Sequence, residues 1–150
     1  MRIYLLIILF FCTFIANGQK LFDEGYSDCN CAKACLYCGD SAAYPRIKIA
    51  EYIRRKIEHS PNHFVQTSGR MLFEICVDST GHPCVLSVKD EIHMWDVKNT
   101  IRNSINEMEA WHPALLAGRP ISSTVILKIH FVGNLLRIGL ARKEELDQSE

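Results

Sequence analysis

Residues 69–89 hold two runs of alternating apolar side chains, separated by a short turn sequence. Alternation with a period of two is typical of strands with one buried face. The turn sequence DSTG at residues 78–81 contains an aspartate that can hydrogen-bond the backbone ahead of it and a glycine that accepts positive φ. We therefore predict a β-hairpin. Its apolar set is Met71, Phe73, Ile75 and Val77 in the first strand and Cys84, Leu86 and Val88 in the second.

The register of this hairpin follows from the apolar set. If Val77 lies opposite Cys84, both apolar runs fall on one face, with a bulge at Gly81 to fit the turn. This register places Cys76 and Cys84 on opposite faces of the sheet, with Cys76 on the outside. Because an isolated hairpin is only marginally stable in water, it needs a further strand and helices to cover it.

Two helices and a third strand are predicted around the hairpin. Residues 47–59 and the helix that we expect Asp96 to cap both place apolar residues at helical spacing. Trp111, after the second helix, is expected to be half-buried. Residues 121–132 alternate again and form the third strand. The helical stripes are Ile49, Ile53 and Ile57 in the first helix and Val97, Ile101, Ile105 and Met108 in the second.

The expected fold class is α+β, a three-stranded antiparallel sheet with two helices packed on one face. The element order is helix, strand, strand, helix, strand, and this arrangement buries all the apolar stripes at once. The third strand is then an edge of the sheet. Its unpaired N–H and C=O groups form a template for another extended chain.

Residues 1–18 are expected to be a signal peptide. Arg2 precedes an unbroken apolar run, and the sequence ANG at residues 16–18 places small residues where a signal peptidase cleaves. The run is shorter than the roughly 20 residues of a spanning helix. Cleavage after Gly18 delivers the chain to the periplasm or the cell envelope. An uncleaved leader that anchors the chain in the inner membrane is the alternative.

Residues 19–45 form a cysteine-rich segment without clear periodicity. An exported chain meets an oxidising compartment, so an even number of cysteines favours disulfides. A zinc site is the weaker alternative, because Cys29 and Cys31 lie too close together for paired zinc-binding knuckles. A thioredoxin-like role for Cys35 and Cys38 lacks the required βαβ setting. We expect no metal and no cofactor, and the disulfide candidates are Cys29, Cys31, Cys35, Cys38, Cys76 and Cys84.

Charge and histidine placement argue against two classes of function. The chain has 17 basic and 17 acidic residues, and loss of Arg2 with the leader leaves 16 basic ones. Proteins that bind nucleic acid usually present a strongly basic face, so no nucleic acid is expected. None of the six histidines has a neighbour in a recognised nucleophile–base arrangement. We therefore predict no enzyme, no catalytic residue and no small-molecule substrate.

An ordered set of motifs resembles the C-terminal domain of TonB-type energy transducers. The resemblance covers about residues 49–131, a little over half of the chain. It rests on Glu51-Tyr52-Ile53, Val77-Asp78-x-x-Gly81, the helix start at Asp96, Met108-x-x-Trp111-x-Pro113-Ala114, Gly118-x-Pro120 and Ile129-x-Phe131.

The resemblance implies a non-enzymatic domain at residues 46–133, followed by a charged tail at residues 134–150. Such a domain grips an extended segment of a TonB-dependent outer-membrane receptor, or of another envelope protein, by strand addition to its last strand. A homodimer through the same edge is the other expected use of that strand. The partner-binding residues implied are Thr124, Val125, Ile126, Leu127, Lys128, Ile129, His130 and Phe131.

The chain departs from a full transducer in three respects. Its leader is short, it has no proline-rich spacer to cross the periplasm, and it has six cysteines after the leader. We therefore interpret it as a stand-alone exported module. The second hypothesis is a disulfide-stabilised structural or accessory envelope protein without receptor binding. In that case the cysteine-rich segment covers the outer face of the sheet, and Cys76 bonds to one of its cysteines.

Overall fold

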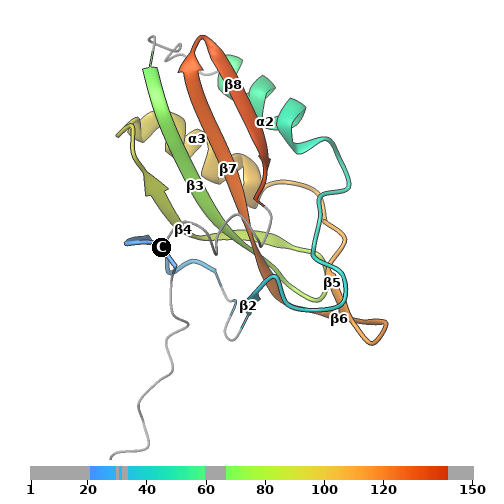
Figure 1. Cartoon of the computed structure of the whole chain (residues 1–150). Helices are drawn as coiled ribbons and strands as arrows, with labels where there is room; N and C mark the ends of the chain where they lie inside the picture. Colours follow the sequence, from blue (N-terminus) through green and yellow to red (C-terminus); the bar gives the residue numbers. More distant parts are fainter. Residues whose placement is uncertain (1–20, 30, 32–33, 60–66, 142–150) are drawn as a thin grey trace, which may run out of the picture.

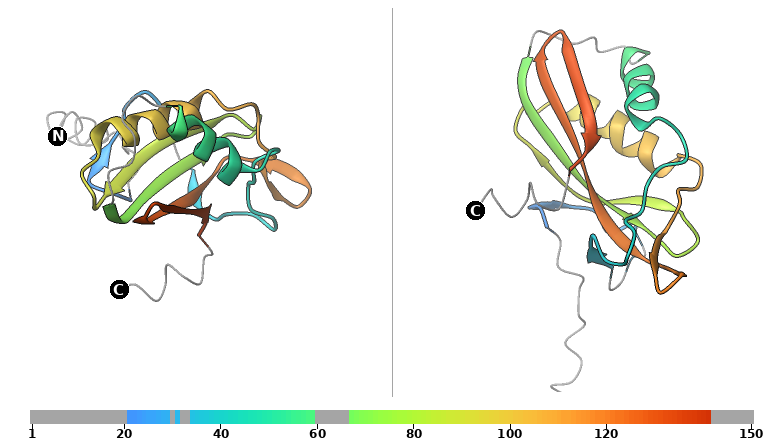
Figure 2. Two further views of the ribbon diagram at one scale, coloured as in Figure 1. Left: turned by 90° about the horizontal axis from the view of Figure 1, so that it is seen from above. Right: turned by 45° about the vertical axis from the view of Figure 1, so that its right-hand side comes forward.

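The computed structural model describes residues 21–29, 31, 34–59 and 67–141. Within these residues a curled, mixed six-stranded sheet carries two helices on one face, and a two-stranded sheet lies at one end (Figure 1 and Figure 2). We call the sheet face away from the helices the outer face. The expected leader and residues 142–150 of the expected tail lie outside the described residues. The elements are β1 (Glu24–Gly25), β2 (Cys35–Leu36), α2 (Ile49–Glu58), β3 (Thr67–Val77), β4 (Pro83–Asp90), α3 (Trp95–Asn106), β5 (Ala114–Leu116), β6 (Arg119–Ile121), β7 (Ser123–Gly133) and β8 (Leu135–Leu140).

The predicted fold class is wrong, although its three strands exist. They are β4, β3 and β7, which are antiparallel neighbours in the middle of the sheet. The sheet of the described residues nevertheless has six strands and is mixed, because β2 runs parallel to β7, while β5 and β6 form a separate pair. Strands β1 and β2 have two residues each. Strands of that length are too short to show a period of two.

Both helices bury the predicted stripes against the inner face of the sheet. Ile49, Ile53 and Ile57 of α2 are buried, as are Val97, Ile101, Ile105 and Met108 in and after α3. The predicted cap of α3 is wrong, because the N-cap residue is Met94 and Asp96 lies in the first turn. Trp111 is fully buried rather than half-buried, and its Nε1 donates to the sulfur of Met108 (3.1 Å).

The register between β3 and β4 also differs from the predicted one. Val77 pairs with Pro83 and not with Cys84, which lies opposite Cys76. The bulge lies in β4 rather than at Gly81, because Glu74 pairs with Ser87 while Ile75 pairs with Val85, which leaves Leu86 without a direct partner. This bulge lets Val85 and Val88 both face the core. The prediction that Cys76 and Cys84 lie on opposite faces is therefore wrong, since directly paired residues share a face.

The turn between β3 and β4 follows the predicted chemistry. Asp78 Oδ1 accepts hydrogen bonds from the backbone N–H groups of Thr80 (2.8 Å) and His82 (2.9 Å). Gly81 has a φ of +91°, and the N–H of Trp111 donates to its carbonyl (2.7 Å). A Cβ atom at Gly81 would lie 2.3 Å from the carbonyl oxygen of Trp111. The turn thus needs glycine both for its backbone conformation and for this close approach.

Candidate functional site

Strand β7 carries the residues predicted to bind a partner, Thr124 to Phe131. It pairs with β3 along its whole length, and its other side pairs with β8 over residues 127–132 and with β2 over residues 123–124. The expectation that this strand is an open edge is therefore wrong. Its main chain is already bonded on both sides. Along the strand Val125, Leu127, Ile129 and Phe131 are buried in the core, and Thr124, Ile126, Lys128 and His130 alternate with them on the outer face.

Strand β8 is an edge of the sheet, and no other described strand pairs with its far side. The N–H of Ala141 donates to Ile126 O (2.8 Å), so the backbone groups of Ala141 point toward β7. Because successive residues of a strand turn these groups to opposite sides, every second residue of β8 points them outward. Arg54 of α2 donates to Leu136 O (3.2 Å) from that side. The residues with outward backbone groups are Leu136, Ile138 and Leu140.

Basic side chains of β3, β7 and β8 meet on the outer face. His130 lies directly opposite Arg70 on one side and Arg137 on the other. Lys128 lies opposite Gly139, which has no side chain. A pocket of about 320 Å³ is lined by Lys128, His130, Arg137, Gly139 and Ile138, and we call it the basic pocket. The Nε2 atom of His130 is buried and has no hydrogen-bond partner among the described residues.

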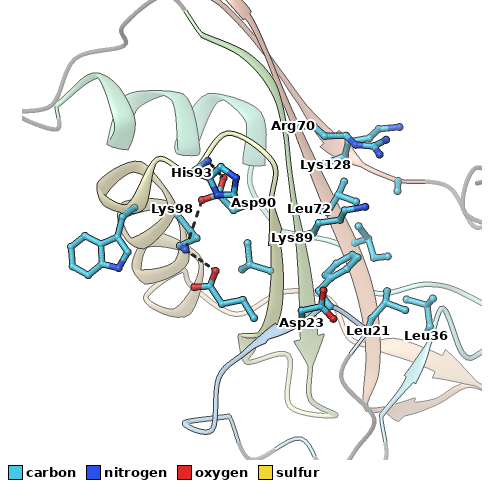
Figure 3. A pocket seen from close by; sticks show the side chains of 16 residues that line it. Leu21, Asp23, Leu36, Arg70, Leu72, Lys89, Asp90, His93, Lys98 and Lys128 are labelled. Carbon is cyan, nitrogen blue, oxygen red and sulfur yellow. Dashed lines mark hydrogen bonds and ion pairs between the residues drawn. The ribbon is translucent and has the colours of Figure 1, made fainter.

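A larger pocket of about 840 Å³ lies beside the N-terminal segment (Figure 3). Leu21 and Leu36 line it from that segment, and Leu72 lines it from β3. Figure 3 shows Arg70 and Lys128 at the end of the pocket away from Leu21 and Leu36. Basic side chains thus lie at one end of this pocket, and leucines together with Asp23 lie at the other.

Glu91 balances part of this positive charge. Arg70 Nε donates to both carboxylate oxygens of Glu91 (2.8 Å each), and Lys89 Nζ lies 3.5 Å from one of them. The hydrogen bond from Arg70 lowers the pKa of Glu91, and the positive charges of Arg70 and Lys89 add to the effect. Arg137, in contrast, forms no ion pair with any described residue. Arg137 on β8 therefore carries a charge that no described carboxylate balances.

Buried polar groups hold the N-terminal segment on the outer face. The carboxylate of Glu74 accepts hydrogen bonds from the N–H of Leu21 (3.0 Å) and from the hydroxyl of Ser87. The same hydroxyl accepts a bond from the N–H of Phe22 (3.2 Å). Glu74 and Ser87 are both buried. Strand β1 continues this attachment by pairing with β4.

Tyr37 connects the cysteine-rich segment to the end of β8. Its backbone N–H donates to Thr124 O (2.8 Å), and its hydroxyl donates to Ala141 O (2.6 Å) and accepts from the N–H of Ile126 (3.1 Å). The hydroxyl therefore lies between β7 and the residue that follows β8. This contact fixes one end of the open edge.

The six cysteines of the described residues form three disulfides, which confirms the predicted disulfide bonding. The pairs are Cys29–Cys84, Cys31–Cys76 and Cys35–Cys38. The prediction that Cys76 bonds to a cysteine of the N-terminal segment on the outer face is confirmed. Two of the three bonds fasten that segment to β3 and β4, and the third closes a small loop. Disulfides of this kind are compatible with an exported protein.

Two residues of the basic pocket, Arg137 and Gly139, were missed in the sequence. The pattern that marks them is the alternation of Leu136, Ile138 and Leu140 with Arg137 and Gly139. This is a period of two over five residues, the length of an ordinary strand. Only Ala141 separates it from the charged run at residues 142–147, so the sequence favours a charged tail there over a strand.

No protein-family model, curated protein or solved structure matches this chain. The relation to TonB-type transducers accordingly stays a resemblance between motifs. In the part of the chain that the structure describes, no group of three or more His, Cys, Asp or Glu residues is placed to hold a metal ion. No helix among the described residues is long and apolar enough to cross a bilayer.

Proposed function

We propose that this chain is a non-enzymatic binding module of the periplasm or cell envelope that takes an extended segment of another envelope protein by strand addition at β8. The observation that carries the proposal is the open edge of β8, where Leu136, Ile138 and Leu140 turn their backbone groups away from β7. Arg54 donates to the carbonyl of Leu136, and strand addition would use the other outward groups of this row.

The resemblance to TonB-type domains supports the same mode of binding at a different strand. Strand addition to β7 would require β8 to leave the sheet, because β8 occupies that side over residues 127–132. Addition to β8 requires no rearrangement of the described strands. We therefore place the partner, for which the N-terminal segment of a TonB-dependent receptor is the first candidate, beside β8.

Nuclear magnetic resonance of the oxidised chain tests this proposal. Peptides from receptor N-terminal segments are titrated into the ¹⁵N-labelled protein, and we expect the amide signals of Leu136, Ile138 and Leu140 to shift most. If these three amides stay unchanged at saturating peptide, strand addition at β8 is refuted.

A matched pair of variants distinguishes the contribution of the Ile138 backbone to peptide binding from that of its side chain. Ile138→Pro removes one outward N–H of β8, and proline is tolerated on edge strands. Ile138→Ala removes the same side-chain packing but keeps the N–H. We expect Ile138→Pro to weaken peptide binding about tenfold more than Ile138→Ala does, the effect of one lost hydrogen bond of about 1.4 kcal/mol. Equal loss in both variants would contradict a main-chain contact.

The second candidate is an accessory envelope protein without receptor binding. The disulfides Cys31–Cys76 and Cys29–Cys84, which fasten the N-terminal segment to the outer face, favour it. The two candidates differ in their use of β8, which in the second serves only as the end of the sheet. Sedimentation of the oxidised chain also tests a homodimer through β8, which would compete with peptide for the same edge.

A further inference from the structure

We propose that the segment added to β8 alternates acidic and aliphatic residues, with one acidic side chain opposite Gly139 reaching into the basic pocket. This inference rests on the proposed function and specifies the chemistry of the partner.

The basic pocket has the charge for such a side chain. Lys128 and His130 of β7 and Arg137 of β8 line it, and no acidic residue is among the described residues that do so. Arg137 lies directly opposite His130 across the sheet, and it forms no ion pair with any described residue. A carboxylate beside Arg137 would balance its charge, and charge-assisted hydrogen bonds of this type are among the stronger ones in proteins.

His130 provides an independent sign of a missing hydrogen-bond partner. Its Nε2 atom is buried and unpaired among the described residues. Buried polar atoms of side chains nearly always have a partner, and an orphaned one needs an explanation. Because Nε2 is buried, a carboxylate in the basic pocket would bond this atom after the His130 ring turns toward the pocket.

Gly139 gives the entry route from the open edge. A Cβ atom at this position would meet nothing within 4 Å, so the space above the backbone is open. Gly139 lies between the edge and Lys128, its direct partner on β7. Gly139 therefore places no side chain of its own in the path of one that crosses from a strand beside β8.

The alternation of strands then sets the remaining pattern. Successive side chains of an added strand point to opposite faces. Those on the outer face lie beside Arg137 and Gly139, while the others lie beside Leu136, Ile138 and Leu140, which are half-buried next to the core. The two faces of β8 thus select acidic residues and aliphatic residues in turn.

Three peptides of about eight residues, within the usual length of a strand, test the inference on the oxidised full chain. They alternate Val with Glu, Val with Gln, or Val with Lys, and affinity is measured by calorimetry while the β8 amides are followed by nuclear magnetic resonance. We expect the Glu peptide to bind at least about tenfold more tightly than the Gln peptide, because one charge-assisted hydrogen bond is gained. The Lys peptide should bind most weakly.

Two variants test whether the preference for Glu over Gln arises at the basic pocket. Arg137→Gln removes a charge of the pocket, and Gly139→Val fills the route across β8 without a clash at Cβ. Both should reduce the preference for Glu over Gln to about threefold or less, a loss of most of one charged contact. Arg119→Gln, at an exposed arginine of β6, is the matched control and should leave the preference unchanged.

The outcomes separate this inference from the proposed function. If the Glu and Gln peptides bind equally and both shift the β8 amides, strand addition stands and the acidic preference is overturned. If the preference is present but survives in Arg137→Gln and Gly139→Val, the assignment to the basic pocket is overturned. If no peptide moves the β8 amides, the proposed function itself fails.

Discussion

Cys31 bonds to Cys76 across the outer face of the sheet, and so joins the N-terminal segment to the fully buried end of β3. The two residues are 45 positions apart, whereas Cys35 and Cys38 are separated by only three. A disulfide stabilises a fold mainly by restricting the unfolded chain, and the restriction grows with the length of the closed loop. The three bonds of this chain should therefore differ in their contribution to stability.

Removal of the Cys31–Cys76 bond should be more costly than removal of the Cys35–Cys38 bond. Because the Cys29–Cys84 bond remains, the loop that Cys31–Cys76 closes runs only through residues 29–31 and 76–84. On loop length alone, the double variant Cys31→Ala/Cys76→Ala should therefore lose about 3 kcal/mol of unfolding free energy and Cys35→Ala/Cys38→Ala about 2 kcal/mol. Urea unfolding of the two variants and the parent, followed by circular dichroism, gives these values. Equal losses, or a larger loss for the short loop, would show that loop length does not govern the difference.

The contact between Gly81 and Trp111 predicts a strong effect of a single methyl group. Gly81→Ala places an alanine at a φ of +91° and a Cβ atom 2.3 Å from Trp111 O. The backbone strain alone is worth about 1–3 kcal/mol, and we expect a total loss of at least about 2 kcal/mol. Gly139→Ala is the control, because its Cβ meets nothing within 4 Å. Thermal unfolding that ranks the two variants alike would contradict the argument.

The parts of the fold that were predicted correctly are those in which neighbours along the chain determine burial. The alternation from Met71 to Val77 and the stripes of α2 and α3 each require one side to be buried, whatever the rest of the chain does. The position of Cys76 on the outer face follows from the same alternation. Its bond to a cysteine of the N-terminal segment could therefore be foreseen, although its specific partner Cys31 could not.

The parts that failed depend on contacts between distant segments. Residues 84–88 read CVLSV, and either Leu86 or Val85 can be placed in the core until the bulge in β4 is known. The edge strand is β8 rather than the predicted β7, because six residues after Gly133 fold back and pair with β7. Pairing of this kind is set by the available space on the neighbouring strand, which local periodicity does not report.

Lys98 is the buried cation of an ion pair whose loss should be costly. Its Nζ lies 2.7 Å from Glu24 Oε2 and 3.7 Å from Asp90 Oδ2, and the side chains of Lys98 and Asp90 are only 9% and 5% exposed. Lys98→Met keeps the apolar stem but leaves Asp90 buried without its cation, which should cost roughly 3 kcal/mol.

Lys89→Met is the matched control for this substitution. The side chain of Lys89 is 51% exposed, and its ion pair with Glu91 is 3.5 Å long. Exposed pairs contribute at most about 1 kcal/mol. Denaturant unfolding in which Lys98→Met loses no more than Lys89→Met would show that Asp90 does not depend on Lys98.

Tyr26 should make the stability of the chain sensitive to alkaline pH. Burial, and then the nearby carboxylate of Glu24, raise the pKa of Tyr26 to about 12, although Arg102 over the ring acts in the opposite direction. The unfolded phenol has a pKa of about 10. Because the folded state holds the proton more tightly, the contribution of Tyr26 is fully present below about pH 10 and is lost as the pH rises toward 12.

The variant Tyr26→Phe isolates this contribution, because it removes the titrating hydroxyl and keeps the ring under Arg102. The hydroxyl also donates to Glu24 Oε1 (3.2 Å), so the parent should be the more stable protein near neutral pH. Unfolding free energies of both proteins are measured from pH 8 upward. The parent forms tyrosinate in the unfolded state first, so its slope with pH should be the steeper one above about pH 10. Parallel slopes, or an advantage of the parent that grows in this range, would mean that the folded state does not hold the phenol proton more tightly than the unfolded chain does.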